Sequence, residues 1–167
     1  VITGRQSPRD GFGPRYFLRG YGERAFLRMN ANAYLGLNRH PRVVEAEERA
    51  ARHYGTTPGA VRFISGTFET HIKLEERLAS FHKREAGMIF SSAYASVMGV
   101  LPQLITKETL VVSDALNHNS IINAVRLAQP TAKAIYEHRD TTRLRAVLEQ
   151  HLGKVKRVIV ATDGVFS

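Results

Sequence analysis

Short apolar runs recur at a regular interval along the second half of this chain, and segments with helical periodicity separate them. In two of the intervening segments, apolar side chains follow one another at three- and four-residue steps, as on one face of a helix. The alternation is typical of βαβ units and predicts an α/β fold, with four buried strands in a mainly parallel sheet and helices on both faces, a three-layer αβα arrangement. The predicted strands are residues 87–90, 110–112, 132–136 and 157–161, and the helical positions are Val97, Val100, Leu101 and Leu104, then Leu144, Val147, Leu148 and His151.

Two further helices are predicted upstream of these units. Pro41 suits the first turn of a helix over residues 41–54. A second helix is expected over residues 68–83, with Thr67 placed to cap its N-terminus. Between the two, residues 55–59 carry the glycine and proline of a loop.

Positive charge is concentrated at the start of the chain. The net charge is +9, and residues 1–44 hold eight Arg against only Asp10 and Glu23. Such an arm can bind nucleic acid or a small anion, but neither a Cys/His finger nor an aromatic RNA-binding signature accompanies it. We therefore expect no nucleic-acid partner. We divide the chain into a basic segment of strand and loop, residues 1–40, and the first part of a larger domain, residues 41–167.

Composition removes several other classes of site. The 167 residues include no Cys, which excludes disulfide frameworks, thiol nucleophiles and thiolate zinc sites and suits a location in the cytoplasm. The seven His residues do not fall at ligand spacing on a common helix, so no metal is expected. No apolar stretch approaches the roughly 20 residues that span a bilayer, so we also expect no membrane segment.

Polar residues follow three of the predicted strands. In open parallel sheets, ligands bind beyond the carboxyl ends of the strands, where helix N-termini offer free N–H groups. Residues 91–94 form a hydroxyl-bearing turn that opens a helix, which suits a phosphate, although an ordinary Ser-capped helix has the same pattern. Residues 113–120 are either part of a ligand site or a capping cluster, and residues 162–167 follow the last strand. Together the three ends predict a single cleft.

At these strand ends a family resemblance becomes visible. From Asn32 to Ser167 the chain resembles the α-oxoamine synthases, pyridoxal-phosphate (PLP) enzymes of fold type I, the aspartate aminotransferase-like fold. These enzymes condense an amino acid with an acyl-coenzyme A. The segments that carry the resemblance are Asn-Ala-Tyr-Leu-Gly-Leu (32–37), Val-Arg-Phe-Ile-Ser-Gly-Thr (61–67), the turn from Ser113 to Ile122, and Ala-Thr-Asp-Gly-Val-Phe-Ser (161–167).

The resemblance implies PLP as the cofactor and assigns roles to individual residues. Ser92, Ala93 and Tyr94 would surround the cofactor phosphate, mostly through backbone N–H groups. His118 would stack on the pyridine ring, and Ser167 would donate a hydrogen bond to the phenolic oxygen. The amino-acid substrate would lie near the residue that opens the first matching segment, Asn32. The chain departs from the family pattern at Ala33 and at Ser96-Val97.

Within the family, the chain is most similar to the 2-amino-3-ketobutyrate coenzyme A ligases, which implies glycine as the amino acid. The alternatives are other α-oxoamine synthases, which make 8-amino-7-oxononanoate, 5-aminolevulinate or ketosphinganine, and a non-catalytic partner subunit. The resemblance places both the Schiff-base lysine and the aspartate of the pyridine nitrogen beyond Ser167, so the chain looks like the N-terminal part of the enzyme. It further implies a homodimer with a shared active site.

Overall fold

The computed structural model describes residues 1–5 and 15–166, and the chain divides into two compact units, residues 1–67 and 68–167. No helix in these described ranges is long and apolar enough to cross a membrane. The boundary between these units, after residue 67, differs from the boundary after residue 40 that the sequence predicted. The predicted boundary concerns the domains of the whole protein and stays a prediction. Each unit is described below by itself.

The first unit begins with a small antiparallel sheet, in which each strand pairs with the next along the chain. Tyr16 lies opposite Phe26 in this sheet, and the guanidinium of Arg24 lies 5.0 Å from the centre of the Phe26 ring, over its face. The helices that follow are mostly exposed, and none of their residues is fully buried. The elements are β1 (Ile2–Arg5), β2 (Arg15–Leu18), β3 (Ala25–Leu27), the 3-10 helix η1 (Tyr34–Arg39), α1 (Pro41–Tyr54) and α2 (Arg62–Ser65).

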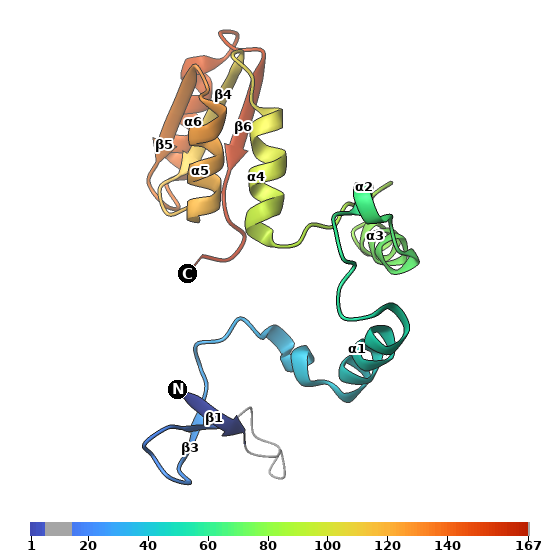
Figure 1. Ribbon diagram of the computed structural model, residues 1–167. Helices are drawn as coiled ribbons and strands as arrows, with labels where there is room; N and C mark the ends of the chain where they lie inside the picture. Colours follow the sequence, from blue (N-terminus) through green and yellow to red (C-terminus); the bar gives the residue numbers. More distant parts are fainter. Residues whose placement is uncertain (6–14, 167) are drawn as a thin grey trace. The chain divides into compact units, whose positions relative to one another are not determined.

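The second unit contains the predicted βαβ units. Its sheet has the order β5-β4-β6 and both strand pairs are parallel, so β4 is the central strand. Figure 1 shows α4 and α5 beside this sheet, with α6 on its other side. The elements are α3 (Glu69–Phe81), α4 (Ala93–Leu104), β4 (Thr109–Asp114), α5 (Asn119–Ala128), β5 (Ala132–Tyr136), α6 (Thr141–His151) and β6 (Arg157–Ala161).

Two apolar clusters hold these layers together, one on each face of β4. Val111 packs with residues of α4 and α5 on one face. Leu110 and Val112 pack with Val147 of α6 on the other. All three β4 residues are completely buried, because successive side chains of a strand point to opposite faces and both faces are covered. The expected three-layer αβα arrangement is therefore confirmed.

Truncation of Leu110 should test how much this core contributes to stability. Leu110→Ala in the full-length protein should lower the free energy of unfolding by about 2–5 kcal/mol, because the change removes apolar contacts and leaves a cavity. Leu152→Ala is the matched control, since that side chain is 83% exposed and should change stability by less than about 0.5 kcal/mol. Denaturant unfolding measures both variants, and equal losses would contradict the assignment of the core.

One predicted strand is wrong. Residues 87–90 pair with no strand in the described part of the chain. The Ile89 N–H instead donates to Oε1 of Glu75 on α3, at 3.1 Å. Gly87 lies so close to α3 that a Cβ there would be 3.0 Å from the Glu75 carbonyl oxygen. An apolar run indicates burial, but a strand also needs a partner to complete its ladder of hydrogen bonds.

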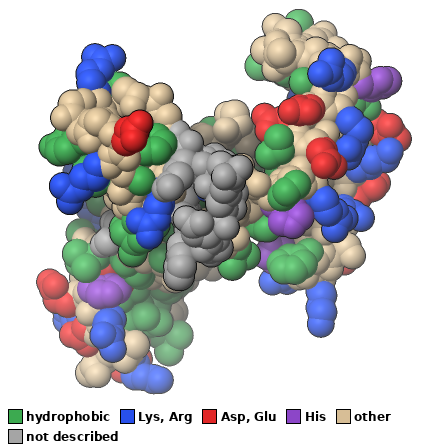
Figure 2. All heavy atoms as spheres, turned by 90° about the horizontal axis from the view of Figure 1, so that it is seen from below, with side chains coloured by type: hydrophobic (Ala, Val, Ile, Leu, Met, Phe, Trp, Pro, Cys, Tyr) green, Lys and Arg blue, Asp and Glu red, His purple; other side chains and the backbone are tan. Residues whose placement is uncertain are grey.

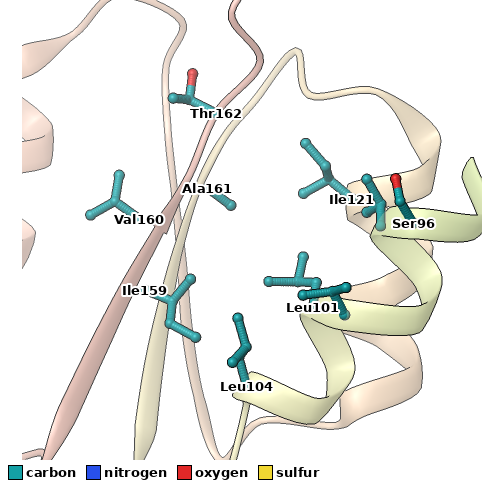
Figure 3. A pocket seen from close by; sticks show the side chains of 10 residues that line it. Ser96, Leu101, Leu104, Ile121, Ile159, Val160, Ala161 and Thr162 are labelled. Atoms are coloured by element: carbon teal, nitrogen blue, oxygen red, sulfur yellow. The ribbon is translucent and has the colours of Figure 1, made fainter. Parts of the chain in front are cut away.

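The outer strands are also less buried than predicted. Ile135 on β5 and Val160 on β6 are 63% and 44% exposed, because among the described residues each strand has a ladder partner on one side only. Beside β6 runs an open apolar groove of about 430 Å³, in which Ile159 points toward Leu101 and Leu104 of α4 (Figure 3). Figure 2 shows further apolar side chains at the surface among the charged ones. Of the four strands predicted to be buried, β4 is the one that is buried within the described residues.

The predicted helix over residues 68–83 is shorter and begins differently. It spans Glu69–Phe81, and Phe68 rather than Thr67 is its N-cap residue. The Phe68 N–H donates to Nδ1 of His71 at 3.1 Å, and the two rings stack 5.7 Å apart. The Thr67 hydroxyl accepts a hydrogen bond from Nε of Arg62 instead.

Candidate functional site

The carboxyl ends of the three parallel strands lie at one edge of the sheet. Asp114, the last residue of β4, is level with Tyr136 at the end of β5, and Ser113 is level with Ala161 at the end of β6. The turns that follow these strands therefore start side by side. This is the edge at which open α/β sheets bind ligands.

The N-terminus of α4 offers free backbone donors. Ser92 is the N-cap residue, and its Oγ accepts a hydrogen bond from the Ala95 N–H at 3.0 Å. The N–H groups of Ala93 and Tyr94 have no acceptor within the described residues, as is usual in a first helical turn, and both residues are exposed. The Tyr94 hydroxyl accepts from Nδ2 of Asn123 on α5 at 3.1 Å, which ties the two helices together. Two free amides at a positive helix end suit an anion.

His118 caps the next helix and presents its ring to solvent. Its Nδ1 accepts a hydrogen bond from the Ser120 N–H at 3.1 Å and lies 2.8 Å from the Ser120 hydroxyl. Because Nδ1 accepts from a backbone N–H, the neutral ring carries its proton on Nε2 and the Ser120 hydroxyl donates to Nδ1. The imidazole is therefore exposed but fixed in orientation.

A buried amide joins the ends of β4 and β6. Asn117 is 5% exposed, and its Nδ2 donates to the Ala161 carbonyl at 2.8 Å and to the Ser113 hydroxyl at 2.9 Å. Its Oδ1 accepts from the Asp163 N–H at 3.0 Å. Asp163 in turn accepts the His118 N–H on Oδ2 at 2.7 Å. We call Asn117 and Asp163 the strand-end clamp, since together they tie the His118 turn to the end of β6.

A second carboxylate, that of Asp114, also fixes the turn that leads to His118. Asp114 is buried, and its Oδ1 accepts the Leu116 N–H at 2.9 Å. Nδ1 of His138 lies 3.2 and 3.1 Å from the two carboxylate oxygens. Burial alone would raise the pKa of Asp114. The hydrogen bonds from Leu116, His138 and Tyr136, together with the charge of His138, outweigh burial, and the pKa lies below its ordinary value.

The lowered pKa of Asp114 gives a pH-dependent expectation. A carboxyl whose folded-state pKa is depressed stabilises the fold above its unfolded pKa and loses that contribution as the pH falls through the folded value. Asp114→Asn should therefore be less stable than wild type between pH 7 and pH 5, and the margin should shrink as the pH falls below about pH 4. Denaturant unfolding over this range provides the check. A margin that is already gone at pH 5 would count against the assignment.

The structure brings four of the predicted site residues into the second unit: Ser92, Ala93 and Tyr94 at the start of α4, and His118 at the start of α5. Asn32 is exposed and lies in the first unit, ahead of η1. Ser167 lies outside the described residues. Residues 113–120 form a capping cluster at the start of α5, and their role in a ligand site stays a prediction.

Sequence reasoning missed three residues of this region. Asn117 and Asp163 lay within the polar strand ends, but their pairing joins residues 46 positions apart and has no sequence signal. His138 was set aside with the other scattered histidines. Its only signal was its position two residues after a predicted strand. Within the described ranges no group of three His, Asp or Glu side chains could hold a metal ion.

The residues at the starts of α4 and α5 fit a cofactor that combines a phosphate with a flat ring. The free amides of Ala93 and Tyr94 suit a phosphate dianion at a helix N-terminus. The oriented ring of His118 suits stacking on an aromatic ring. PLP has both groups.

Comparison with known proteins agrees with this chemistry. The chain is 47% identical over 141 residues to 8-amino-7-oxononanoate synthase 1 of Bacillus velezensis, covering 84% of this chain and 36% of that protein. It is 46% identical over 146 residues to the 8-amino-7-oxononanoate synthase of Geobacter metallireducens, covering 87% of this chain and 37% of that protein. The chain thus spans little more than a third of the curated relatives it matches.

Solved structures confirm the fold. A serine palmitoyltransferase from S. paucimobilis, holding a PLP–myriocin aldimine, matches with a TM-score of 0.86 at 24% identity, over 100% of this chain and 39% of that one. An 8-amino-7-oxononanoate synthase from Francisella tularensis matches with a TM-score of 0.66 at 20% identity, over 82% of this chain and 36% of that one. The expected fold, the PLP-dependent transferase fold of type I in part, is confirmed.

The relatives also indicate to which group of enzymes within the family the chain is most similar. They are 8-amino-7-oxononanoate synthases, one of the alternatives that the sequence left open, and they favour that group over the 2-amino-3-ketobutyrate coenzyme A ligases. The model of the aminotransferase class I and II family matches residues 24–167. The chain belongs to the aminotransferase class I and II family, where it is one of the α-oxoamine synthases.

Proposed function

We propose that the protein containing this chain is a PLP-dependent acyltransferase that condenses an amino acid with an acyl-coenzyme A. One observation carries the proposal: two free amides at the start of α4 and the fixed ring of His118 lie at the starts of two helices that pack together, joined by the hydrogen bond from Asn123 to the Tyr94 hydroxyl. Bound there, PLP would supply an electron sink for the carbanion of the amino acid. The similarity to α-oxoamine synthases supports the same class of reaction.

The chain's own residues would bind and orient. The amides of Ala93 and Tyr94 would hold the phosphate, helped by the positive end of α4. His118 would pack against one face of the pyridine ring. The strand-end clamp would keep His118 in place, because Asp163 accepts its N–H and Asn117 fixes Asp163. Two further roles rest on the resemblance alone. Asn32 would lie near the amino-acid substrate, and Ser167 would donate a hydrogen bond to the phenolic oxygen.

For the substrates, we propose alanine and pimeloyl-coenzyme A. The chemical name of the relatives' product supports this pair: in 8-amino-7-oxononanoate, the amino-bearing carbon and its terminal methyl are what alanine leaves after it loses its carboxyl group as carbon dioxide. The remaining seven carbons correspond to a seven-carbon dicarboxylic acyl group, which coenzyme A releases as it leaves. The new carbon–carbon bond joins the two parts, and the atoms balance.

Product identification tests this choice. Full-length protein with PLP is incubated with alanine, glycine or serine, each paired with pimeloyl-, acetyl- or palmitoyl-coenzyme A. The products are identified by mass spectrometry. We expect 8-amino-7-oxononanoate from alanine and pimeloyl-coenzyme A as the main product. Aminoketobutyrate from glycine and acetyl-coenzyme A would restore the 2-amino-3-ketobutyrate ligase hypothesis. Binding of PLP without any product would favour the non-catalytic partner subunit.

We also propose that the whole protein is a homodimer with a shared active site, in the cytoplasm. The proposal rests on the resemblance, in which the segment from Gly55 to Thr67 reaches the neighbouring subunit. Phe63 and Ile64 in that segment are 89% and 70% exposed, as expected of side chains that a partner covers. Sedimentation of the active full-length protein as a monomer would contradict it.

A further inference from the structure

His138 links all three strand ends of the second unit. It lies two residues beyond the end of β5, and its Nδ1 is within 3.2 Å of both oxygens of Asp114, the last residue of β4. The edge of its ring packs on Phe166, which follows β6, with the ring centres 4.3 Å apart and the planes at 60°. A single imidazole thus contacts the segments at the ends of β4 and β6 from the end of β5.

The contact with Asp114 determines the direction of the Asp114 carboxylate. A carboxylate only accepts hydrogen bonds, so the proton of this pair lies on Nδ1 of His138. Oδ1 of the same carboxylate accepts the Leu116 N–H, two residues before His118. The carboxylate that fixes the start of the His118 turn is therefore held by the donor on His138, together with the side chain of Tyr136.

The strand-end clamp holds the end of this turn, at Asn117 and His118, and backbone hydrogen bonds hold its start. The Ala115 N–H donates to the Tyr136 carbonyl at 3.0 Å and the Asn117 N–H to the Asp114 carbonyl at 3.3 Å. Both anchor the backbone beside Asp114 but do not fix the Leu116 amide. That amide is fixed by the Asp114 side chain, which His138 orients.

We propose that His138 is a positioning residue for His118: by holding the Asp114 carboxylate, it fixes the turn that presents the His118 ring to the cofactor. The inference rests on the proposed function, because it assumes that His118 stacks on PLP. It adds a residue from a third strand end, one that itself touches neither the phosphate nor the ring.

Two substitutions separate the donor of His138 from its ring. In His138→Asn, the amide nitrogen occupies the place of Nδ1, so the bond to Asp114 is kept while the ring against Phe166 is lost. In His138→Phe, the ring is kept and the donor is lost. A residue that served only to pack the fold would change the unfolding temperature in both variants, without separating them in cofactor binding.

The experiment measures PLP affinity by spectral titration, and the visible circular dichroism per bound PLP, in the full-length protein. We expect His138→Phe to weaken affinity about 10-fold and to reduce the dichroism, since one charge-assisted hydrogen bond is lost. His138→Asn should stay within about 2-fold of wild type. The double variant His118→Ala/His138→Phe should bind PLP no more weakly than His118→Ala, because both changes act on one ring.

The outcomes distinguish this inference from the proposed function. If wild type shows no visible band with PLP, the proposed function fails and the inference fails with it. If wild type binds PLP and His138→Phe binds it equally well, or the double variant is additive, only the inference fails. Should His138→Phe not fold, His138→Ala with added imidazole replaces it. Recovery of affinity with imidazole supports the inference, and no recovery overturns it.

Discussion

Asn117→Ala in the full-length protein is expected to lower both stability and cofactor affinity. The change removes three hydrogen bonds, two of which join the turn after β4 to the end of β6, and leaves the Asp163 N–H and the Ala161 carbonyl without this partner. Each buried polar group left unpaired costs about 1–3 kcal/mol, so a loss of about 2–4 kcal/mol in unfolding free energy is expected. PLP affinity should fall at least about 10-fold, because Asp163 no longer holds the His118 N–H in place.

Asn119→Ala is the matched control for this variant. Asn119 is exposed and begins α5 two residues later, but it takes no part in the strand-end clamp. Denaturant unfolding and spectral titration with PLP should therefore leave this control close to wild type. If Asn117→Ala loses stability but keeps its PLP affinity, the clamp supports the fold without positioning His118.

Replacement of His118 should have its largest effect on the cofactor rather than on the fold. The ring is exposed, so His118→Ala removes little packing and one helix cap, and stability should change by about 1 kcal/mol. Loss of the stacked ring should weaken PLP affinity by about 10-fold and shift the visible absorption band of bound PLP. Turnover should fall further, because the cofactor is no longer held in one orientation.

Two variants make this test specific. His118→Phe keeps a flat ring and should recover part of the affinity. His82→Ala removes another exposed histidine, at the end of α3, and should not alter PLP binding. If His118→Ala retains the wild-type spectrum and affinity, His118 has only its capping role at the start of α5.

The sequence predicted the second unit well where the signal is local. Three apolar runs became β4, β5 and β6, because each has the length and composition of a strand and a helix pattern follows two of them. The run at 87–90 has the same composition, but no described strand lies beside it to complete a ladder. Burial was overestimated for the same reason: Val160 has a strand on one side only, and the pattern does not show which edges are covered.

The candidate site shows the same difference between local sequence signals and long-range contacts. Ser92 and His118 were predictable because a polar residue directly before a helix is itself a sequence pattern, and both are N-cap residues. The contact of Asn117 with Asp163 and that of His138 with Asp114 join residues from different βαβ units, and only folding brings them together. The sequence thus indicated the exposed residues at the starts of the helices but not the contacts that hold them in place.

The most direct test of the account is a crystal structure of the full-length protein with PLP. We expect the phosphate within about 3 Å of the N–H groups of Ala93 and Tyr94, with the His118 ring stacked on the pyridine ring. Asn117 and Asp163 should keep the contacts described here. A phosphate bound away from the start of α4, or a pyridine ring that His118 does not touch, would contradict it.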